Sequence, residues 1–519
     1  MDATEPADSR LGSSRAGESR HSRSPQSPRA GRLALATGLA MAGGAFGGLL
    51  LPRGAVTTLQ AVLTVIGCLL LGAYAALVAR SRWVLLVLPL AFAAAYETAR
   101  LPITGPTVDG VRLDGIYGLL MFTVGRGIDG LVTLPALLVG AGWGLMASRR
   151  WRRFDARPSS TGRVVGTRII LGIGTVAVLA LLIGLVRPAS TEAITDASGA
   201  PMPGSISELT VAQIGGHDQH LMIRGHDRTN PVLLFLEGGP GGSALGRMRR
   251  SGEPLEEHFV VVTWDQRGTG KSYAALEPTD TLTVQSMTED TLEVTDYLRE
   301  RFGQDRIYLV GSSWGSIIGV RAVQSRPELF HAYVGTGQMV DPFETDALMY
   351  EENLDQARRT GDATRVARLE EWGPPPYEDP LGYTEALTGN PEWFDFPHGE
   401  DFDPASEYPL CFFAAEYTLI EQLRGMAAMA ETFAVLYPQL GHVDFRQDVR
   451  RLDVPIYMIQ GAHEAEGREV LAREWFDMLD AESKQWIEFD RSGHTPNYDE
   501  PGRFTDVMVD VVLAETRGQ

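Results

Sequence analysis

The stretch Arg306–Val320, RIYLVGSSWGSIIGV, limits the folds open to this chain more than any other. The apolar run Ile307–Val310 is typical of a buried strand, and the small and aliphatic residues after Gly315 can begin a helix. Between them lies the pattern Gly-x-Ser-x-Gly, with Ser313 at its centre. A strand, a sharp turn at a serine and a helix form a nucleophile elbow. The stretch therefore predicts an α/β fold in which Ser313 is the nucleophile at the head of a helix.

The chain combines a basic, apolar first part with an acidic second part. Residues 1–187 contain 20 Arg, no Lys and 9 acidic residues, a net charge of +11, and the remaining residues carry a net charge of −31. Because 519 residues exceed one ordinary domain, we expect two or more units. The acidic second part argues against nucleic acid as a partner.

Cysteine usage predicts a fold held by its apolar core. The chain has two cysteines, Cys68 within an apolar run and Cys411, so a disulfide framework is not expected. No Cys/His spacing typical of a metal site occurs. We therefore expect neither a metal nor a cofactor.

Residues 33–187 are predicted to form a transmembrane domain of about five helices. Most of its apolar runs approach the ~20 residues that cross a bilayer. The runs are Leu33–Leu51, Leu59–Ala79, Trp83–Tyr96, Leu131–Ala147 and Ile169–Val186. A further stretch, residues 116–124, is too short to cross alone and is interfacial, re-entrant or the start of a longer tilted span. Residues 1–32, rich in Ser, Arg and Pro, are expected to be a disordered cytoplasmic leader, which with the later spans disfavours a signal peptide.

Arginine placement predicts how the helices are oriented. With the N-terminus inside, 15 of the 20 arginines of this part fall in cytoplasmic segments. The cluster between residues 149 and 168 carries most weight, and the helix after it then leads outward. We therefore expect the residues after about Pro188 to lie outside the cell membrane. Two lysines against abundant arginine and alanine point to a bacterium of high genomic GC content.

After a polar linker over residues 188–207, strands alternate with helices. The buried strands Pro231–Leu236 and Phe259–Trp264 each open into a glycine-bearing loop. An amphipathic helix over about Thr288–Arg301 precedes the elbow strand. This alternation predicts a doubly wound, mostly parallel sheet with helices on both faces.

Three linked motifs carry a family resemblance. LEGGPGGS, WDQRGTGKS and GSSWGS follow one another in an order and spacing that resemble the proline iminopeptidase branch of the α/β-hydrolase superfamily. The resemblance covers roughly Glu208–Gln519 and implies a core over residues 208–340 and 452–519, with a mainly helical cap over the acidic, irregular residues 341–451. Members usually carry His-Gly-Gly-Pro-Gly, and this chain has Glu237 where the histidine would be. The membrane part has no counterpart in the resemblance.

The glycine loop after Glu237 is suited to an oxyanion hole. Acyl transfer builds an oxyanion that backbone N–H groups free of side-chain bulk can bind. We expect one donor from Trp314, directly after the nucleophile, and the other from Gly239. The GTGKS sequence at residues 268–272 lacks the spacing of a phosphate-binding loop, and Asp265 and Arg267 are expected to brace their loop rather than to catalyse.

The chain order of the fold places the remaining members of a catalytic triad. The acid belongs in the loop after the buried strand Val454–Gln460, where Glu464 lies, with Glu466 as the runner-up. His494 follows the last strand, Gln485–Asp490, and is the expected general base. Ser313, Glu464 and His494 then satisfy the order nucleophile, acid, base.

In the resembled peptidases, carboxylates of the cap hold the free amine of the substrate. Glu416, Glu421 and Asp395 are candidates here, and Glu237 is a candidate from the loop; for each, a solvated acidic face is the alternative. The sequence thus predicts a membrane-anchored serine hydrolase, an aminopeptidase of the proline iminopeptidase type that acts on small peptides. An ester hydrolase of the same fold is the alternative, and a non-catalytic binding protein is the alternative of another class.

Overall fold

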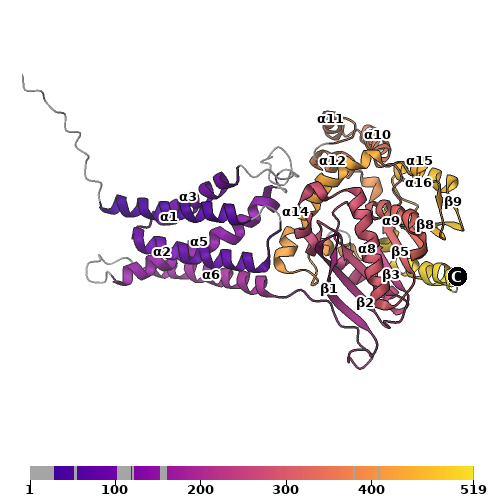
Figure 1. Cartoon of the computed structure of the whole chain (residues 1–519). Helices are drawn as coiled ribbons and strands as arrows, with labels where there is room; N and C mark the ends of the chain where they lie inside the picture. The colour runs from indigo at the N-terminus through magenta and orange to yellow at the C-terminus, as the bar shows by residue number, and fades with distance from the viewer. Residues whose placement is uncertain are drawn as a thin grey trace, which may run out of the picture.

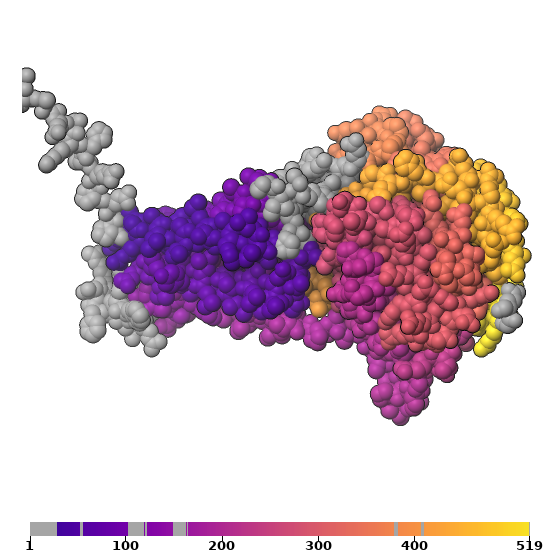
Figure 2. All heavy atoms as spheres, viewed as in Figure 1, coloured from indigo at the N-terminus to yellow at the C-terminus, as the bar shows by residue number. Residues whose placement is uncertain are grey.

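The computed structural model describes residues 28–51, 55–101, 119, 122–151, 161–377, 380–406 and 409–517. It has two parts that lie end to end, a bundle of long helices and an α/β domain (Figure 1). The space-filling view shows the elongated bundle in contact with the broader domain at one of its ends (Figure 2). Most of the predicted leader, residues 1–27, lies outside the described residues, and the first helix begins within it, at Pro28.

The bundle contains helices that run along its length in alternating directions (Figure 1). These are α1 (Pro28–Leu50), α2 (Thr58–Ala79), α3 (Val84–Arg100), α5 (Ile128–Trp151) and α6 (Thr161–Val186). A π-helical turn, η2 (Thr123–Gly127), leads directly into α5. Thr123 and Val124, the last residues of the stretch 116–124, therefore begin a longer helix. Most of that stretch lies outside the described residues.

Four helical segments among the described residues are long and apolar enough to cross a membrane. They are Arg29–Leu50, Thr58–Ala79, Thr123–Ser148 and Val165–Val186. Between 11% and 44% of each apolar window is buried inside the protein, so the remaining leucine and isoleucine side chains face outward. The fifth helix, α3, has 17 residues with Pro89 in its interior and is shorter than the other four.

Small residues let the bundle helices approach closely. A Cβ atom on Gly72 of α2 would collide with the carbonyl oxygen of Leu137 of α5, and one on Gly140 of α5 would collide with the carbonyl oxygen of Leu69 of α2. Close backbone approach at glycine is typical of helix pairs in membranes, where apolar surface alone provides little drive for association.

The α/β domain is built on one sheet of eight strands in the order β1-β2-β4-β3-β5-β6-β8-β10. The strands are β1 (Ile206–Ile214), β2 (His217–Gly225), β3 (Val232–Leu236), β4 (Val260–Asp265), β5 (Ile307–Ser312), β6 (Phe330–Thr336), β8 (Ile456–Gly461) and β10 (Lys484–Phe489). The pairs β1–β2 and β2–β4 are antiparallel and all others are parallel. Two short strands, β7 (Arg451–Leu452) and β9 (Asp480–Ala481), form a separate pair.

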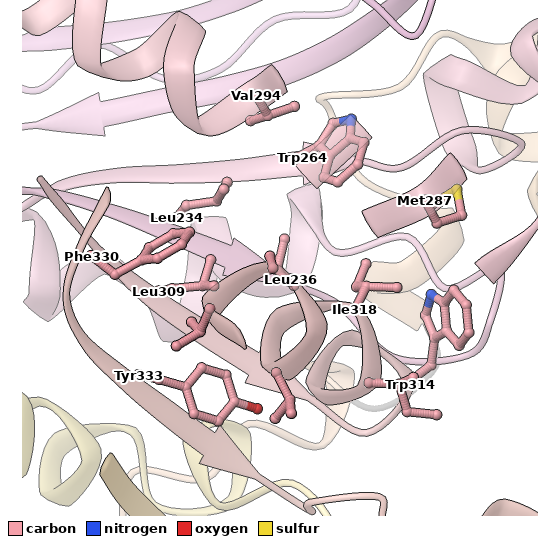
Figure 3. Packing of buried hydrophobic residues seen from close by; sticks show 14 of the residues in the cluster. Leu234, Leu236, Trp264, Met287, Val294, Leu309, Trp314, Ile318, Phe330 and Tyr333 are labelled. Carbon is pink, nitrogen blue, oxygen red and sulfur yellow. The ribbon is translucent and has the colours of Figure 1, made fainter. Parts of the chain in front are cut away.

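The central strands are apolar throughout because both faces of the sheet are covered. Leu234 and Leu236 of β3 belong to one hydrophobic cluster, and Leu233 and Phe235 belong to the other. The covering helices include α7 (Leu245–Ser251), α8 (Val284–Phe302), α9 (Trp314–Ser325), α16 (Glu466–Met478), α17 (Pro496–Asp499), α18 (Pro501–Val507) and α19 (Ala514–Thr516). Figure 3 shows strand residues such as Leu234, Leu309 and Tyr333 packed around α9, with Trp314 and Ile318.

The elements between β6 and β8 form a helical layer. They are α10 (Pro342–Thr360), α11 (Ala363–Trp372), α12 (Pro380–Leu387), α13 (Pro409–Phe412), α14 (Leu419–Leu436) and α15 (Phe445–Asp448). Helices α13 and α14 are separate, because Thr418 is the N-cap of α14 and its amide donates to the Glu421 carboxylate at 2.7 Å. The mostly parallel sheet, its covering helices and this insertion make the domain an α/β-hydrolase fold, as predicted.

The segment between the bundle and the sheet is bound to the domain. Arg224 of β2 donates to the hydroxyl groups of Thr191 and Ser207 at 2.8 and 2.7 Å and to the carbonyl oxygen of Glu192. The Ser190 amide donates to the carbonyl oxygen of Ala415 at 2.9 Å. The predicted linker is therefore attached both to the sheet and to the helical layer.

Candidate active site

Ser313 occupies a strained turn between β5 and α9. Its φ and ψ are 51° and −121°, a conformation that a residue with a side chain rarely adopts and that recurs at functional sites. A Cβ atom on Gly315 would lie 2.2 Å from the carbonyl oxygen of Leu236, so only glycine lets α9 begin this close to β3. The Ser313 amide donates to the carbonyl oxygen of Thr336 at 3.0 Å, which ties the turn to the end of β6.

The glycine loop after β3 lies beside the Ser313 side chain. A Cβ atom on Gly238 would be 2.9 Å from Cβ and 3.5 Å from Oγ of Ser313. Within the described part of the chain, the backbone amides of Gly239 and Trp314 donate no hydrogen bond to the protein. One of these amides directly follows the serine and the other belongs to the residue after Gly238, and both are available to a ligand, as an oxyanion hole requires.

Glu464 and His494 form a hydrogen-bonded pair at the same edge of the sheet. Glu464 Oε2 and His494 Nδ1 are 2.5 Å apart, and the Glu464 side chain is 1% exposed. Since β8 and β10 are parallel neighbours, the loops that follow their carboxyl ends meet there. The runner-up, Glu466, is exposed at the first position of α16.

The environment of Glu464 favours its ionised form. Burial raises the pKa of the carboxyl group, but the charges of His494 and Arg468 and the hydrogen bonds to it lower the pKa by more, to about 2. Arg468 donates to Oε1 at 3.2 Å and the Ala465 amide donates to the same oxygen at 2.9 Å. Arg468 was missed by the sequence reasoning, although its position four residues after Glu464 is a signal for a helical ion pair.

Ser313 and His494 adjoin two consecutive residues at the end of β6. Thr336 accepts the hydrogen bond from the Ser313 amide, and a Cβ atom on Gly337 would be 2.7 Å from Cε1 and 2.8 Å from Nδ1 of His494. In the described residues no hydrogen bond joins the imidazole to the Ser313 hydroxyl. A general base works at about 2.6–3.2 Å, and such contacts are often longer without substrate. The backbone of Thr336 and Gly337, which the sequence did not single out, brings the two side chains to one place.

Glu237 is engaged within the protein. Its Oε2 accepts a hydrogen bond from the Tyr498 hydroxyl at 2.6 Å, and its Oε1 accepts one from the Gly238 amide at 2.9 Å. The Arg247 guanidinium lies 3.5 Å from Oε1 and stacks on the Tyr498 ring. These groups engage the buried carboxylate within the protein, so Glu237 is a weaker candidate than an exposed carboxylate for holding a substrate amine.

Glu421 and Glu416 also have internal partners. Glu421 accepts from the Thr418 amide at 2.7 Å and from Lys271 Nζ at 2.8 Å, so it caps α14 and ties it to the loop after β4. Burial raises the pKa of Glu416, which lies near Arg249 and Arg224 beside the linker. Both carboxylates support the packing of the helical layer, a role that sequence patterns did not separate from substrate binding.

Asp395 is the cap candidate with an exposed carboxylate. Within the described residues that carboxylate makes no hydrogen bond. The next residue, Phe396, stacks on His463 with ring centroids 4.8 Å apart, and it lies 3.0 Å from the position of a Cβ atom on Gly493. Asp395 is therefore next to the two loops that carry Glu464 and His494.

The loop after β4 is braced as expected. Asp265 accepts hydrogen bonds from the Lys271 amide at 2.8 Å and from the Tyr417 hydroxyl at 3.0 Å. Arg267 donates to the carbonyl oxygen of Ala275 at 2.7 Å. Gln266 bonds both the indole of Trp314 and the carbonyl oxygen of Glu237, each at 2.9 Å, and so links the glycine loop to the elbow. No group of three or more His, Cys, Asp or Glu side chains suited to a metal ion occurs in the described ranges.

One family model matches the chain, and several known proteins are similar to it. Residues 231–370 match the α/β hydrolase fold family. A probable aminopeptidase, YbaC of Bacillus subtilis, is 29% identical over 316 residues, which cover 59% of this chain and 97% of that protein. A probable proline iminopeptidase of Streptomyces coelicolor is 33% identical over 113 residues, 22% of this chain and 34% of that protein. The solved structure of a proline iminopeptidase-related protein from Thermus thermophilus aligns with 22% identity and a TM-score of 0.41. The alignment covers 60% of this chain and 98% of that protein.

The fold and these matches define the class of protein. The α/β part of the chain has the α/β-hydrolase fold, and residues 231–370 match that family. The proteins that it resembles in sequence include a probable aminopeptidase and a probable proline iminopeptidase.

Proposed function

We propose that this protein is a membrane-anchored serine hydrolase that removes the N-terminal residue from small peptides through an acyl-enzyme. His494 takes the proton of the Ser313 hydroxyl as its oxygen attacks the scissile carbonyl carbon. The amides of Gly239 and Trp314 bind the resulting oxyanion. His494 then gives the proton to the leaving amine as the C–N bond breaks. Water, deprotonated by His494, attacks the ester carbonyl, and His494 returns this proton to the Ser313 oxygen as the C–O bond breaks and the acyl group leaves.

The observation that carries this proposal is the placement of three groups at one edge of the sheet. The Ser313 amide donates to the carbonyl oxygen of Thr336, and the imidazole of His494 lies against the next residue, Gly337. Glu464 is bonded to the other side of the imidazole at 2.5 Å. Because the pKa of Glu464 is lowered to about 2, its carboxylate is ionised at neutral pH and stabilises the imidazolium that forms during proton transfer.

Membrane anchoring is supported by the bundle. Its outward faces are apolar, and four segments reach the length of a span. The connection between α2 and α3, with Arg80 and Arg82, lies at the end of the bundle away from the hydrolase (Figure 1). Since arginine-bearing connections stay inside, we propose that the N-terminus is cytoplasmic and that the hydrolase lies outside a bacterial cell membrane.

For the substrate amine we propose Asp395. It is the candidate with an exposed carboxylate, and it lies next to the loops of the proposed acid and base. The engagement of Glu237, Glu416 and Glu421 in internal contacts favours a second candidate function, hydrolysis of a carboxylic ester, which needs no group for an amine.

A fluorophosphonate probe tests the proposed chemistry on the full chain in detergent. Such probes phosphonylate an activated serine, so we expect the wild type to be labelled and Ser313→Ala to be unlabelled and inactive, with turnover reduced at least about 10⁴-fold. Ser325→Ala, at the exposed far end of the same helix, is the matched control and keeps labelling. Turnover by folded Ser313→Ala refutes the assignment, and an unlabelled wild type supports a binding protein instead.

Two substrates separate the candidate functions. A proline-β-naphthylamide reports on aminopeptidase activity and a p-nitrophenyl ester reports on esterase activity. A kcat/KM for the amide that depends on a free amino group supports the peptidase. Turnover of the ester alone supports the second candidate.

A further inference from the structure

Helix α14 is shared between the bundle and the hydrolase. On one face, Ile420 is buried in the hydrophobic cluster of the bundle, with Leu419 and Leu423 packed against it. Further along, Ala427 and Ala430 pack against Val124. Figure 1 shows α14 between the bundle helices and the sheet. The contact is thus an interface between the two parts of the chain, and α14 carries much of it.

A carboxylate of the bundle is bound to this helix. Asp129, in the first turn of α5, is buried and accepts hydrogen bonds from two buried arginines. One of its oxygens bonds Arg100 of α3 and the other bonds Arg424 of α14. Because buried charges need partners, neither arginine can leave this carboxylate without cost. The two arginines differ in one respect: Arg100 belongs to the bundle, whereas Arg424 belongs to the helical layer over the active site.

The other face of α14 lies on the loops of the active site. The carbonyl oxygen of Met429 lies 2.6 Å from the position of a Cβ atom on Gly241, in the same loop as Gly239. Thr432 donates to the carbonyl oxygen of Gly268 at 2.8 Å. Both residues follow Arg424 within about two turns of one rigid helix, so a shift at Arg424 moves them as well.

We infer that Asp129 is a positioning residue for the active site: by holding Arg424 it sets the place of α14, and α14 sets the place of the loop that carries the Gly239 amide. The inference rests on the proposed function and adds to it, because it gives the bundle a part in the reaction besides anchoring. Donors of an oxyanion hole act only when they are placed to within a fraction of an ångström, and a misplacement of about 1 Å can cost about 100-fold in rate. Loss of this contact therefore lowers kcat more than it raises KM.

A matched pair of variants tests the inference in the full chain in lipid nanodiscs, with p-nitrophenyl acetate as the substrate. Arg424→Met and Arg100→Met each remove one arginine from the same carboxylate, but only the first removes a contact with α14. Fluorophosphonate labelling to completion counts the intact sites, and kcat is expressed per labelled site. We expect Arg424→Met to lower kcat at least about tenfold with KM changed less than twofold, and Arg100→Met to keep kcat within about twofold.

A purely structural role gives a different result. It lowers the number of labelled sites in both variants and leaves kcat per site unchanged, and that outcome overturns the inference, as does an equal fall in kcat for both variants. If Arg424→Met does not fold, Arg424→Lys carries the test, and it too must lower kcat per site.

The double variant identifies the partner through which Arg424 acts. If Arg424 acts through Asp129, then Asp129→Asn with Arg424→Met has the kcat of Arg424→Met alone, and a further fall overturns the assigned partner. A wild type without labelling or turnover refutes the proposed function itself, and that result is separate from the variant comparison.

Discussion

The imidazole of His494 lies against the backbone of Gly337, where a Cβ atom would come within 2.7 Å of its Cε1 atom. Gly337 has a φ of +53°, so both its conformation and its surroundings exclude a side chain. The preceding residue, Thr336, accepts the hydrogen bond of the Ser313 amide. The end of β6 therefore sets the separation of the proposed nucleophile and base.

Gly337→Ala is expected to displace the imidazole and to lower kcat at least about 100-fold, since the geometry of proton transfer is lost. The measurement is kcat for p-nitrophenyl acetate. Gly361→Ala is the matched control, because Gly361 has a φ of +72° but no atom within 4 Å of the added Cβ. Gly361→Ala therefore introduces the same kind of backbone strain without a steric contact, and it is expected to keep the kcat of the wild type. Equal kcat in the two variants would show that the contact with His494 is irrelevant.

Glu464→Gln is expected to lower kcat by about 10²- to 10⁴-fold, because the amide cannot stabilise an imidazolium and favours the wrong tautomer of His494. Glu466→Gln, two residues along the chain and exposed, is the control and keeps wild-type kcat. Should Glu466→Gln be the inactive variant, the assignment of the acid moves to Glu466.

Asp265→Asn is expected to change how stability depends on pH. Burial raises the pKa of Asp265 from its ordinary 3.8 to about 7. Between these values the unfolded chain has released the proton while the folded protein retains it, so the wild type loses stability as pH rises from about 4 to about 7. The asparagine does not titrate. The Tm of the variant minus that of the wild type therefore becomes more positive over this interval.

Any hydrogen bond that the asparagine fails to make shifts the difference in Tm equally at every pH, so the slope alone is diagnostic. Thermal melts at pH 4.5, 6 and 8 measure it. Asp280→Asn, which changes an exposed carboxylate near the same loop, is measured in parallel as the control. A difference in Tm between Asp265→Asn and the wild type that does not change with pH would mean that Asp265 ionises alike in the folded and unfolded states.

Asp395→Asn is expected to raise KM for proline-β-naphthylamide about tenfold, because the charged partner of the substrate amine is lost, while kcat/KM for the p-nitrophenyl ester stays unchanged. Glu392→Gln is the control in the same segment, since Glu392 is paired with Arg359. An unchanged KM for the amide would remove Asp395 from the site and favour the ester hydrolase.

The core of the hydrolase was predictable because its signals are local. The run PVLLFL predicts a strand, and β3 occupies Val232–Leu236 with all five residues buried. The pattern around Ser313 likewise predicts the turn that the structure contains, since glycine on each side is what the close packing of β3, β5 and α9 requires. The pairing of Glu464 with His494 followed from the chain order of the resembled family rather than from the residues alone.

What escaped prediction depends on contacts between distant residues. Glu237 is bound by Tyr498, 261 residues later, and Asp129 is bound by Arg424, 295 residues later. No local pattern distinguishes a carboxylate with such a partner from one that awaits a substrate.

The four groups that Arg224 binds, three in or beside the linker and Glu256 at 2.7 Å, leave little slack where the chain leaves the bundle. A flexible linker that made no contacts would let the catalytic domain move through a wide range of positions relative to the bundle. In the membrane-anchored enzyme proposed here, such a short, bound connection would hold Ser313 at a nearly constant height above the lipid headgroups, so that it would act on molecules that reach that level.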